Sequence, residues 1–233
     1  MTAAARRVRA IVALDAPTLA QAIGIVDALG DSCDFYKVGS ELFTAAGPSA
    51  VAALRERGND VFLDLKFHDI PNTVHGAVRS ASRLGAALVT VHASGGADML
   101  RAAVEGAGEN CGVLAVTVLT SLDAEELSQL WGRTVGTVEN EVQRLAEVAR
   151  ATGAHGIVCA ASEAAAVRAA HGDTLRILVP GIRLEGGSAH DQVRVATPKE
   201  AIAAGASYVV LGRAITGASD PLGVMRRVNE MLA

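Results

Sequence analysis

Little in this sequence points to a nucleic-acid partner, because it has few aromatic residues and no excess of positive charge. Phe, Trp and Tyr make up 3% of its 233 residues, and 21 Lys and Arg stand against 25 Asp and Glu, for a formal net charge of −4. Nucleic-acid binders usually need a basic surface that displaces counterions, and single-strand binders add aromatic stacking platforms. We therefore expect no nucleic-acid partner, and any anion site must be local.

Cysteine pairs and long apolar runs are also missing. Cys33, Cys111 and Cys159 lie far apart and outside any CxxC motif, which disfavours a disulfide framework and a cysteine-based zinc site. No apolar run approaches the roughly 20 residues that cross a bilayer, and the segment Met1–Arg9 lacks the apolar core of a signal peptide. We expect a cytoplasmic protein with no membrane partner.

What the sequence does contain is a short apolar run followed by a helical pattern, repeated along the chain. The apolar runs, rich in Val, Ile and Leu, span residues 8–14, 35–38, 61–65, 87–91, 113–119, 156–160, 175–179 and 208–211. A polar segment separates the fifth run from its helix, which is expected over 138–151. Continuous runs of this kind are typical of parallel strands buried on both faces. Eight units with right-handed crossovers predict an α/β fold, a single (β/α)8 TIM barrel that occupies residues 1–233 as one domain.

Polar residues gather where these runs end. In barrels of this class the active site lies at the carboxyl ends of the strands and in the loops that follow them. The candidates at those positions are Asp15, Lys37, Asp64, Lys66, His68, Asp69, His92, Thr120, Ser121, Arg183, Gly212 and Arg213. We expect several of them to meet at the mouth of the barrel.

The densest cluster is the segment DLKFHDIPNT at residues 64–73. Because strand side chains alternate between faces, Asp64 and Lys66 are expected on the same side. Asp15 and Lys37 could complete an alternating network in which neighbouring carboxylates keep the Lys66 ammonium cationic and able to donate a proton. The simpler alternative is an ordinary structural ion pair between Asp64 and Lys66. A Schiff-base lysine is a further alternative, but that role needs a neutral amine, which flanking carboxylates disfavour.

The last two units carry the features of a phosphate site. The seventh run leads into the glycine-containing segment Gly181–Ser188, which is typical of a mobile lid, and Gln192 follows it. Gly212 and Arg213 follow the eighth run, where backbone N–H groups and a guanidinium can hold a phosphate. Loops after the seventh and eighth strands are the usual phosphate site of these barrels. The alternative is that Arg213 caps a helix or pairs with a surface acid.

Neither the histidines nor the glycines indicate a metal or a dinucleotide. The six histidines form no evident ligand set, and no GxGxxG follows a strand. His92 is interpreted as a hydrogen-bonded structural imidazole. Thr120 and Ser121 could contact a heterocycle, but they could equally cap the segment that begins at Leu122. We expect no metal and no cofactor.

Taken together, these motifs closely resemble the bacterial orotidine 5′-phosphate decarboxylases, and the resemblance spans nearly the whole chain. The segments that carry it are ALD (13–15), YKVG (36–39), DLKFHDIPNT (64–73), TVLTS (117–121), PGIR (180–183), DQVR (191–194) and GRAIT (212–216). One departure is Leu184, where the family often has proline, and it predicts a looser lid.

The resemblance implies decarboxylation of orotidine 5′-phosphate to UMP in de novo pyrimidine synthesis, without a cofactor. Lys66 would protonate C6, and Lys37, Asp64 and Asp69 would complete the charged array. Asp64 would also lie against the departing carboxylate. A homodimer is implied, in which Asp69 and Thr73 reach the neighbouring subunit's site. The remaining contacts that it implies are Asp15 and Lys37 with the ribose, Thr120 with the pyrimidine, and Arg183, Gln192, Gly212 and Arg213 with the phosphate or lid.

Two alternatives remain open from the sequence. A sugar-phosphate decarboxylase or aldolase of the same suprafamily, such as 3-keto-gulonate 6-phosphate decarboxylase, shares the Asp-x-Lys-x-x-Asp spacing and needs magnesium. A catalytically silent nucleotide-binding barrel would bind UMP tightly but release no carbon dioxide.

Overall fold

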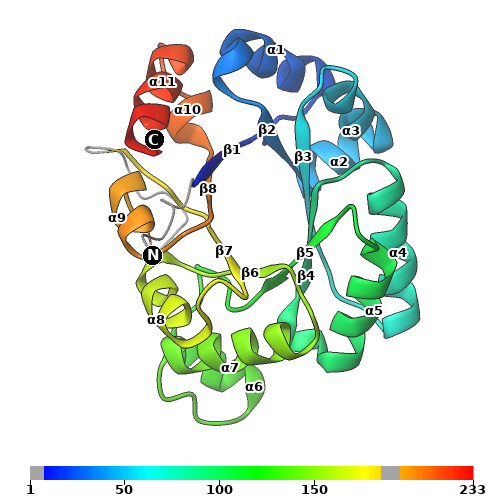
Figure 1. The fold of residues 1–233 in the computed structure, drawn as a ribbon, viewed down its shortest axis with the longest axis vertical. Helices are drawn as coiled ribbons and strands as arrows, with labels where there is room; N and C mark the ends of the chain where they lie inside the picture. Colours follow the sequence, from blue (N-terminus) through cyan, green and yellow to red (C-terminus); the bar gives the residue numbers. More distant parts are fainter. Residues whose placement is uncertain (1–7, 185–194, 233) are drawn as a thin grey trace, which may run out of the picture.

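Eight parallel strands form a closed ring in the computed structural model, which describes residues 8–184 and 195–232 (Figure 1). The strands are β1 (Arg9–Ala13), β2 (Phe35–Gly39), β3 (Asp60–Phe67), β4 (Leu88–His92), β5 (Gly112–Val116), β6 (Gly156–Val158), β7 (Arg176–Val179) and β8 (Tyr208–Leu211). Neighbours in sequence are neighbours in the sheet, and β8 closes the ring by pairing with β1. The predicted (β/α)8 TIM barrel is therefore confirmed.

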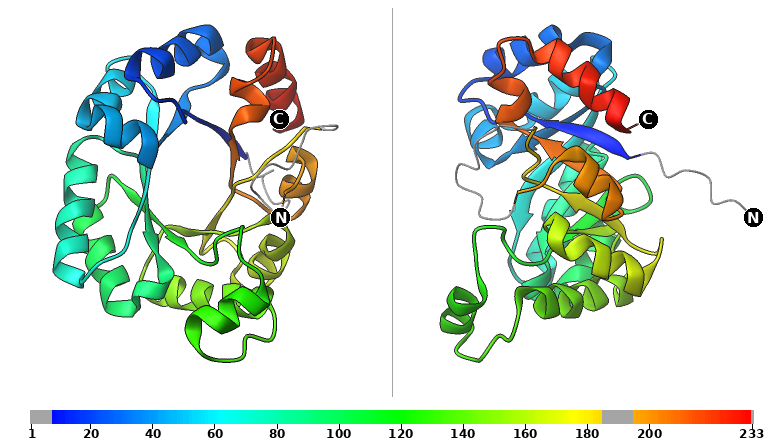
Figure 2. Two further views of the ribbon diagram at one scale, coloured as in Figure 1. Left: turned by 180° about the vertical axis from the view of Figure 1, so that it is seen from behind. Right: turned by 90° about the vertical axis from the view of Figure 1, so that its left-hand side faces the viewer.

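The helices surround this ring on its outside, as the two views of Figure 2 also show. They are α1 (Leu19–Leu29), α2 (Ser40–Ala46), α3 (Pro48–Arg55), α4 (Pro71–Arg83), α5 (Ala97–Ala107), α6 (Ala124–Trp131), α7 (Val138–Ala151), α8 (Ala161–His171), α9 (Pro198–Ala203), α10 (Arg213–Thr216) and α11 (Pro221–Leu232), with short 3₁₀ turns η1 (Gly30–Ser32) and η2 (Ala93–Gly95). Among the described residues, none of these helices combines the length and the apolar character needed to span a bilayer.

Two apolar layers explain why the strands read as continuous apolar runs. Alternate residues of a strand face opposite sides, so in β1 Ile11 belongs to a cluster inside the barrel while Val12 belongs to the larger cluster between strands and helices. Phe35, Phe62 and Leu114, from three other strands, are buried with Ile11 inside the ring. The interior is therefore filled by side chains and is not a pore.

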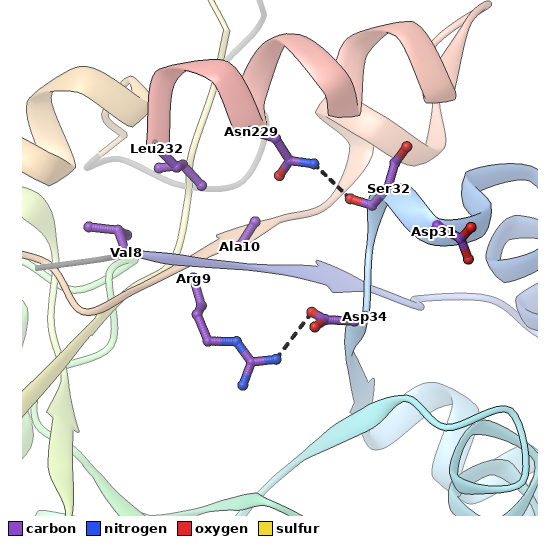
Figure 3. Close-up of a pocket in the computed structure, with 8 residues that line it drawn as sticks. All are labelled: Val8, Arg9, Ala10, Asp31, Ser32, Asp34, Asn229 and Leu232. Carbon is purple, nitrogen blue, oxygen red and sulfur yellow. Dashed lines mark hydrogen bonds and ion pairs between the residues drawn. The ribbon is translucent and has the colours of Figure 1, made fainter.

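Arg9 closes the amino-terminal end of the barrel. Its guanidinium pairs with Asp34 (3.1 Å) and Asp60 (2.9 Å), and it lies over the ring of Phe35 at 4.6 Å. Figure 3 shows the Arg9–Asp34 pair beside a cavity between β1, η1 and α11. These ion pairs occupy the amino-terminal end of the barrel, so the carboxyl-terminal end is the candidate location of the active site.

Two of the expected elements are corrected by the structure. The fifth strand ends at Val116 and not at residue 119. The polar segment after it contains α6, which projects from the ring in the right-hand view of Figure 2. The Asp123 side chain caps this helix by accepting hydrogen bonds from the backbone N–H groups of Glu125 and Glu126. In return, the Glu126 carboxylate accepts a hydrogen bond from the backbone N–H of Asp123. This D-x-x-E capping box was a readable signal in the sequence.

Candidate active site

One cavity at the carboxyl-terminal end of the barrel brings together most of the predicted site residues. Its floor includes Phe62, Val116 and Leu178 from the barrel strands. The predicted residues that line it are Asp15, Lys37, Asp64, Lys66, Thr120, Arg183, Gly212 and Arg213. Residues that are separated by up to about two hundred positions therefore meet because the carboxyl ends of parallel strands lie at the same edge.

Four of these residues form a row of alternating charge. Lys37 Nζ lies 2.7 Å from Asp15 Oδ1 and 3.8 Å from Asp64 Oδ2, and Lys66 Nζ lies 2.8 Å from Asp64 Oδ1. The side chains of Lys37 and Asp64 are only 11% and 13% exposed, whereas that of Lys66 is 39% exposed and reaches the cavity. Each buried charge therefore has a partner of opposite sign, which is the condition under which burial of a charge is tolerated.

The backbone at Lys66 is not that of a regular strand. Its φ is +49°, and it is the one non-glycine residue with positive φ within the described ranges. The pairing of β3 with β4 also shifts register between Leu63 and Phe67. Asp64 and Lys66 are in contact, as simple alternation predicts, but an irregular backbone makes that contact. Such bulges and strained residues are common beside active sites.

The ends of β7 and β8 form another part of the cavity rim, and β8 is the neighbour of β1 in the ring. The backbone N–H of Arg183 donates a hydrogen bond to the carbonyl of Ala196 (2.8 Å), and the Arg183 guanidinium donates one to the carbonyl of Ile182. Gly212 is the N-cap of α10, and Arg213 opens that helix. Thr120 also lines the cavity, and because α6 is capped by Asp123, the alternative that Thr120 or Ser121 caps this helix is wrong.

His92 is the last residue of β4 and is not among the residues that line the cavity. Its ring centroid is 5.4 Å from that of His68. Burial, followed by the nearby charges of His68 and Lys66, lowers the pKa of His92. The imidazole is therefore neutral near pH 7, and its interpretation as a hydrogen-bonded structural residue stays a prediction. Within residues 8–184 and 195–232 no group of three or more His, Cys, Asp or Glu side chains could hold a metal ion.

Comparison with known proteins assigns the chain to a family. The model of the family described as "Orotidine 5'-phosphate decarboxylase / HUMPS family" matches residues 9–228. The chain belongs to this family. A relative from Anaeromyxobacter sp. (strain K), named orotidine 5′-phosphate decarboxylase, is 53% identical over 220 residues, which cover 94% of this chain and 96% of that one. A relative of the same name from Nitrosomonas europaea is 49% identical over 226 residues and covers 97% of both chains.

A solved structure agrees with this assignment. The crystal structure of orotidine 5′-phosphate decarboxylase from Lactobacillus acidophilus superposes with a TM-score of 0.86 at 37% identity, and the match covers 96% of this chain and 98% of that one. The resemblance inferred from the sequence motifs is confirmed, and the protein is an enzyme of the orotidine 5′-phosphate decarboxylase family.

Two of the predicted site residues do not line this cavity within one chain, and a third lies outside the described residues. Asp69 and Thr73 are exposed and do not line it. Asp69 Oδ1 accepts the N–H of Ile70 at 2.6 Å, and the side chain of Ile70, directly before α4, is 67% exposed. Gln192 lies outside the described residues. Leu184 is half-buried against the core, and the rest of the predicted lid segment, 185–188, is outside the described residues as well.

Gly39 is a site residue that the sequence reasoning missed. A Cβ atom at this position would lie 2.7 Å from Lys37 Nζ and 3.2 Å from Asp15 Oδ1. Lys37 and Gly39 share a face of β2 because they are two residues apart, so the absence of a side chain at Gly39 leaves room for the Lys37 ammonium. A glycine inside a strand often marks such a close approach, and that was the available signal.

We predict that Gly39→Ala lowers decarboxylase turnover by about 10- to 100-fold, because the added methyl group displaces the Lys37 ammonium from the charged row and small misplacements are costly in catalysis. Steady-state kinetics and circular dichroism measure the loss and the retained fold. Gly24→Ala is the matched control, because a Cβ there meets nothing within 4 Å. Equal activity of the two variants would contradict the role of Gly39.

Proposed function

We propose that this chain converts orotidine 5′-phosphate to UMP in de novo pyrimidine synthesis, without a cofactor, at the carboxyl-terminal cavity. The observation that carries the proposal is the row of ion pairs from Asp15 through Lys37 and Asp64 to Lys66, which ends at the cavity. The names of the relatives indicate orotidine 5′-phosphate as the substrate, and the row of charges ends in an ammonium group of the kind that this reaction needs.

The chemistry follows from where charge develops. When the bond between C6 and the carboxylate breaks, its electron pair stays on C6 in an in-plane orbital that the pyrimidine ring cannot delocalise well. A fixed ammonium is the group that stabilises such a charge, and in a preorganised site this stabilisation needs little reorganisation. Lys66 Nζ then transfers its proton to C6, and carbon dioxide leaves. Asp64 holds the Lys66 ammonium and also lies against the departing carboxylate, a ground-state effect that ranks below transition-state stabilisation.

The phosphate end of the substrate is assigned to the part of the rim formed by the ends of β7 and β8. Arg183, Gly212 and Arg213 line the cavity there, while Asp15 and Lys37 are assigned to the ribose and Thr120 to the pyrimidine. Gln192, outside the described residues, is assigned to the phosphate and lid. Binding energy from a phosphate remote from C6 can be expressed in the chemical step.

A homodimer completes this proposal. Asp69 and Thr73 belong to the third-strand motif but are exposed and do not line the cavity of their own chain, and the nearby side chain of Ile70 is exposed and apolar. An isologous dimer would bring that segment to the neighbouring cavity, since each subunit then gives what it receives. We also propose that residues 1–233 form a single catalytic domain and that the protein is cytoplasmic.

Lys66→Ala is expected to lower turnover at least about 1,000-fold, because the variant lacks both the proton donor and the positive charge beside C6. The assay follows pyrimidine absorbance with orotidine 5′-phosphate as substrate, in buffer treated with EDTA. Lys199→Ala, which removes an exposed lysine of α9, is the control.

Three outcomes of this assay would count against the proposal. Near-normal turnover of the Lys66→Ala protein would exclude its role as proton donor. Loss of wild-type turnover after chelation would favour a magnesium-dependent sugar-phosphate enzyme. Tight UMP binding by a wild-type chain that releases no carbon dioxide would favour a nucleotide sensor.

Arg213→Ala is expected to weaken UMP binding by about 10- to 100-fold and uridine binding by less than twofold, because a hydrogen bond to a charged group contributes more than one to a neutral group. Calorimetry with both ligands measures the difference. Arg226→Ala removes an exposed arginine of α11 outside the cavity and serves as the control. Equal losses for UMP and uridine would contradict a phosphate contact.

Mixed dimers test whether Asp69 acts in the neighbouring site. Lys66→Ala and Asp69→Ala chains, each expected to be inactive alone, are unfolded together and refolded. A mixed dimer then holds one site with both residues intact, so a random mixture recovers about a quarter of wild-type activity. Lys66→Ala mixed with Asp64→Ala recovers nothing, since both residues belong to one cavity. Failure of the first mixture to regain activity would show that Asp69 acts within its own chain.

A further inference from the structure

We propose that Thr90, in the middle of β4, is a positioning residue that holds both Asp64 and Lys66 in their working geometry. This inference rests on the function proposed above for Lys66. The Thr90 side chain is completely buried, with 0% exposure, and Thr90 is not among the residues that line the cavity. It therefore acts through its neighbours and not by contact with the substrate.

The Thr90 hydroxyl makes two hydrogen bonds, and their directions follow from chemistry. Its Oγ1 lies 2.9 Å from the backbone N of Lys66 and 2.9 Å from Asp64 Oδ1. The Lys66 N–H can only donate, so the hydroxyl accepts there. The single hydroxyl proton is then donated to the carboxylate of Asp64, which has no proton to offer when it is ionised. One side chain thus links the backbone of one charged residue to the side chain of the other.

The first bond stabilises an unusual backbone. Along β3 four residue steps, from Leu63 to Phe67, correspond to two steps along β4, from Val89 to Val91. Thr90 is the β4 residue opposite this bulge, and Lys66 lies within it at a φ of +49°. A backbone N–H displaced from a regular ladder needs another acceptor. The Thr90 hydroxyl is that acceptor, and the hydrogen bond fixes the position of the Lys66 backbone from which its side chain extends.

The second bond selects the orientation of the Asp64 carboxylate. Oδ1 receives both the Thr90 hydroxyl and Lys66 Nζ (2.8 Å), while Oδ2 faces Lys37 Nζ at 3.8 Å. A carboxylate held only by two flexible lysines could rotate about its last bond. Because Thr90 is β-branched and its χ1 angle is therefore restricted, its hydroxyl is a stiff reference point. The charge beside C6 is then preorganised and does not have to reorganise during the reaction.

Three variants test the proposal. Thr90→Val keeps the β-branched shape and removes the hydroxyl, and Thr90→Ser keeps the hydroxyl. Thr117→Val is the matched control, because Thr117 is also a buried threonine near the barrel strands, but its Oγ1 donates only to the carbonyl of Val158 (2.8 Å) in the bonds described. Turnover, UMP affinity and thermal stability are measured for each protein.

We expect Thr90→Val to lower kcat by about 10- to 100-fold, as loss of an orienting partner does at other sites, with UMP affinity changed by less than about threefold. Thr90→Ser should recover most of kcat, and Thr117→Val should keep it. If Thr90→Val does not fold, Thr90→Ala makes the same comparison. A kcat for the hydroxyl-free variant equal to that of Thr117→Val would overturn the proposal, and so would failure of serine to restore it.

Crystal structures of the variants separate this inference from the proposed function. We expect the distance between Asp64 Oδ1 and Lys66 Nζ to lengthen in Thr90→Val and to be kept in Thr90→Ser. An unchanged carboxylate and an unchanged Lys66 backbone in Thr90→Val would refute positioning by Thr90. A wild-type chain that does not decarboxylate orotidine 5′-phosphate would refute the proposed function, and the crystal structures would still decide the role of Thr90.

Discussion

The Asp64 carboxylate, 13% exposed between two ammonium groups, is the constraint on which the site depends. Moving a carboxylate out of water costs several kcal/mol unless partners of opposite charge and hydrogen-bond donors replace the water. Lys37 and Lys66 provide the charge, and Thr90 provides a neutral donor. Removing any one of them leaves a buried charge with too few partners. A cluster under this constraint has one well-defined arrangement, which is what electrostatic catalysis requires.

The two ends of the barrel differ in what they hold: one has the Arg9 ion pairs and the other has the cavity with the charged row. At the amino-terminal end Arg9 pairs with Asp34 and Asp60, and none of these three residues lines the cavity. At the carboxyl-terminal end the apolar side chains of Phe62 and Val116 form part of the cavity floor. A floor of low polarity strengthens the interactions of the charges above it, because the attraction between two charges grows as the effective dielectric constant falls. The same apolar packing that stabilises the fold therefore also strengthens the field in the site.

Two uncharged residues also belong to the proposed arrangement of the charged row. Gly39 contributes empty space for Lys37, and Thr90 contributes a hydroxyl that faces the bulge of β3. Gly39 is the last residue of the YKVG motif and Thr90 belongs to none of the motifs, but the role proposed for each depends on where other side chains lie. Where a strand pairing is irregular, as between Leu63 and Phe67, its partner strand supplies the missing hydrogen bond from a side chain.

The sequence by itself determined the barrel class, the approximate positions of the eight strands and the residues that gather at one end, because apolar periodicity and strand-end polarity are local patterns. The resemblance of its motifs also led to the correct family. Strand ends were less predictable, because hydrogen bonds decide where a strand stops. The capping signal of α6 was present in the sequence, although this helix was not among the predicted elements. The roles of all the predicted site residues remain predictions. Asp69 and Thr73 do not line the cavity within one chain, and Gln192 lies outside the described residues. Only the tertiary structure decided the register shift at Lys66, the clearance at Gly39 and the two bonds of Thr90. The register shift and the bonds of Thr90 depend on how β3 and β4 pair, and the clearance at Gly39 depends on where the Lys37 and Asp15 side chains meet. Neither can be read from local sequence patterns.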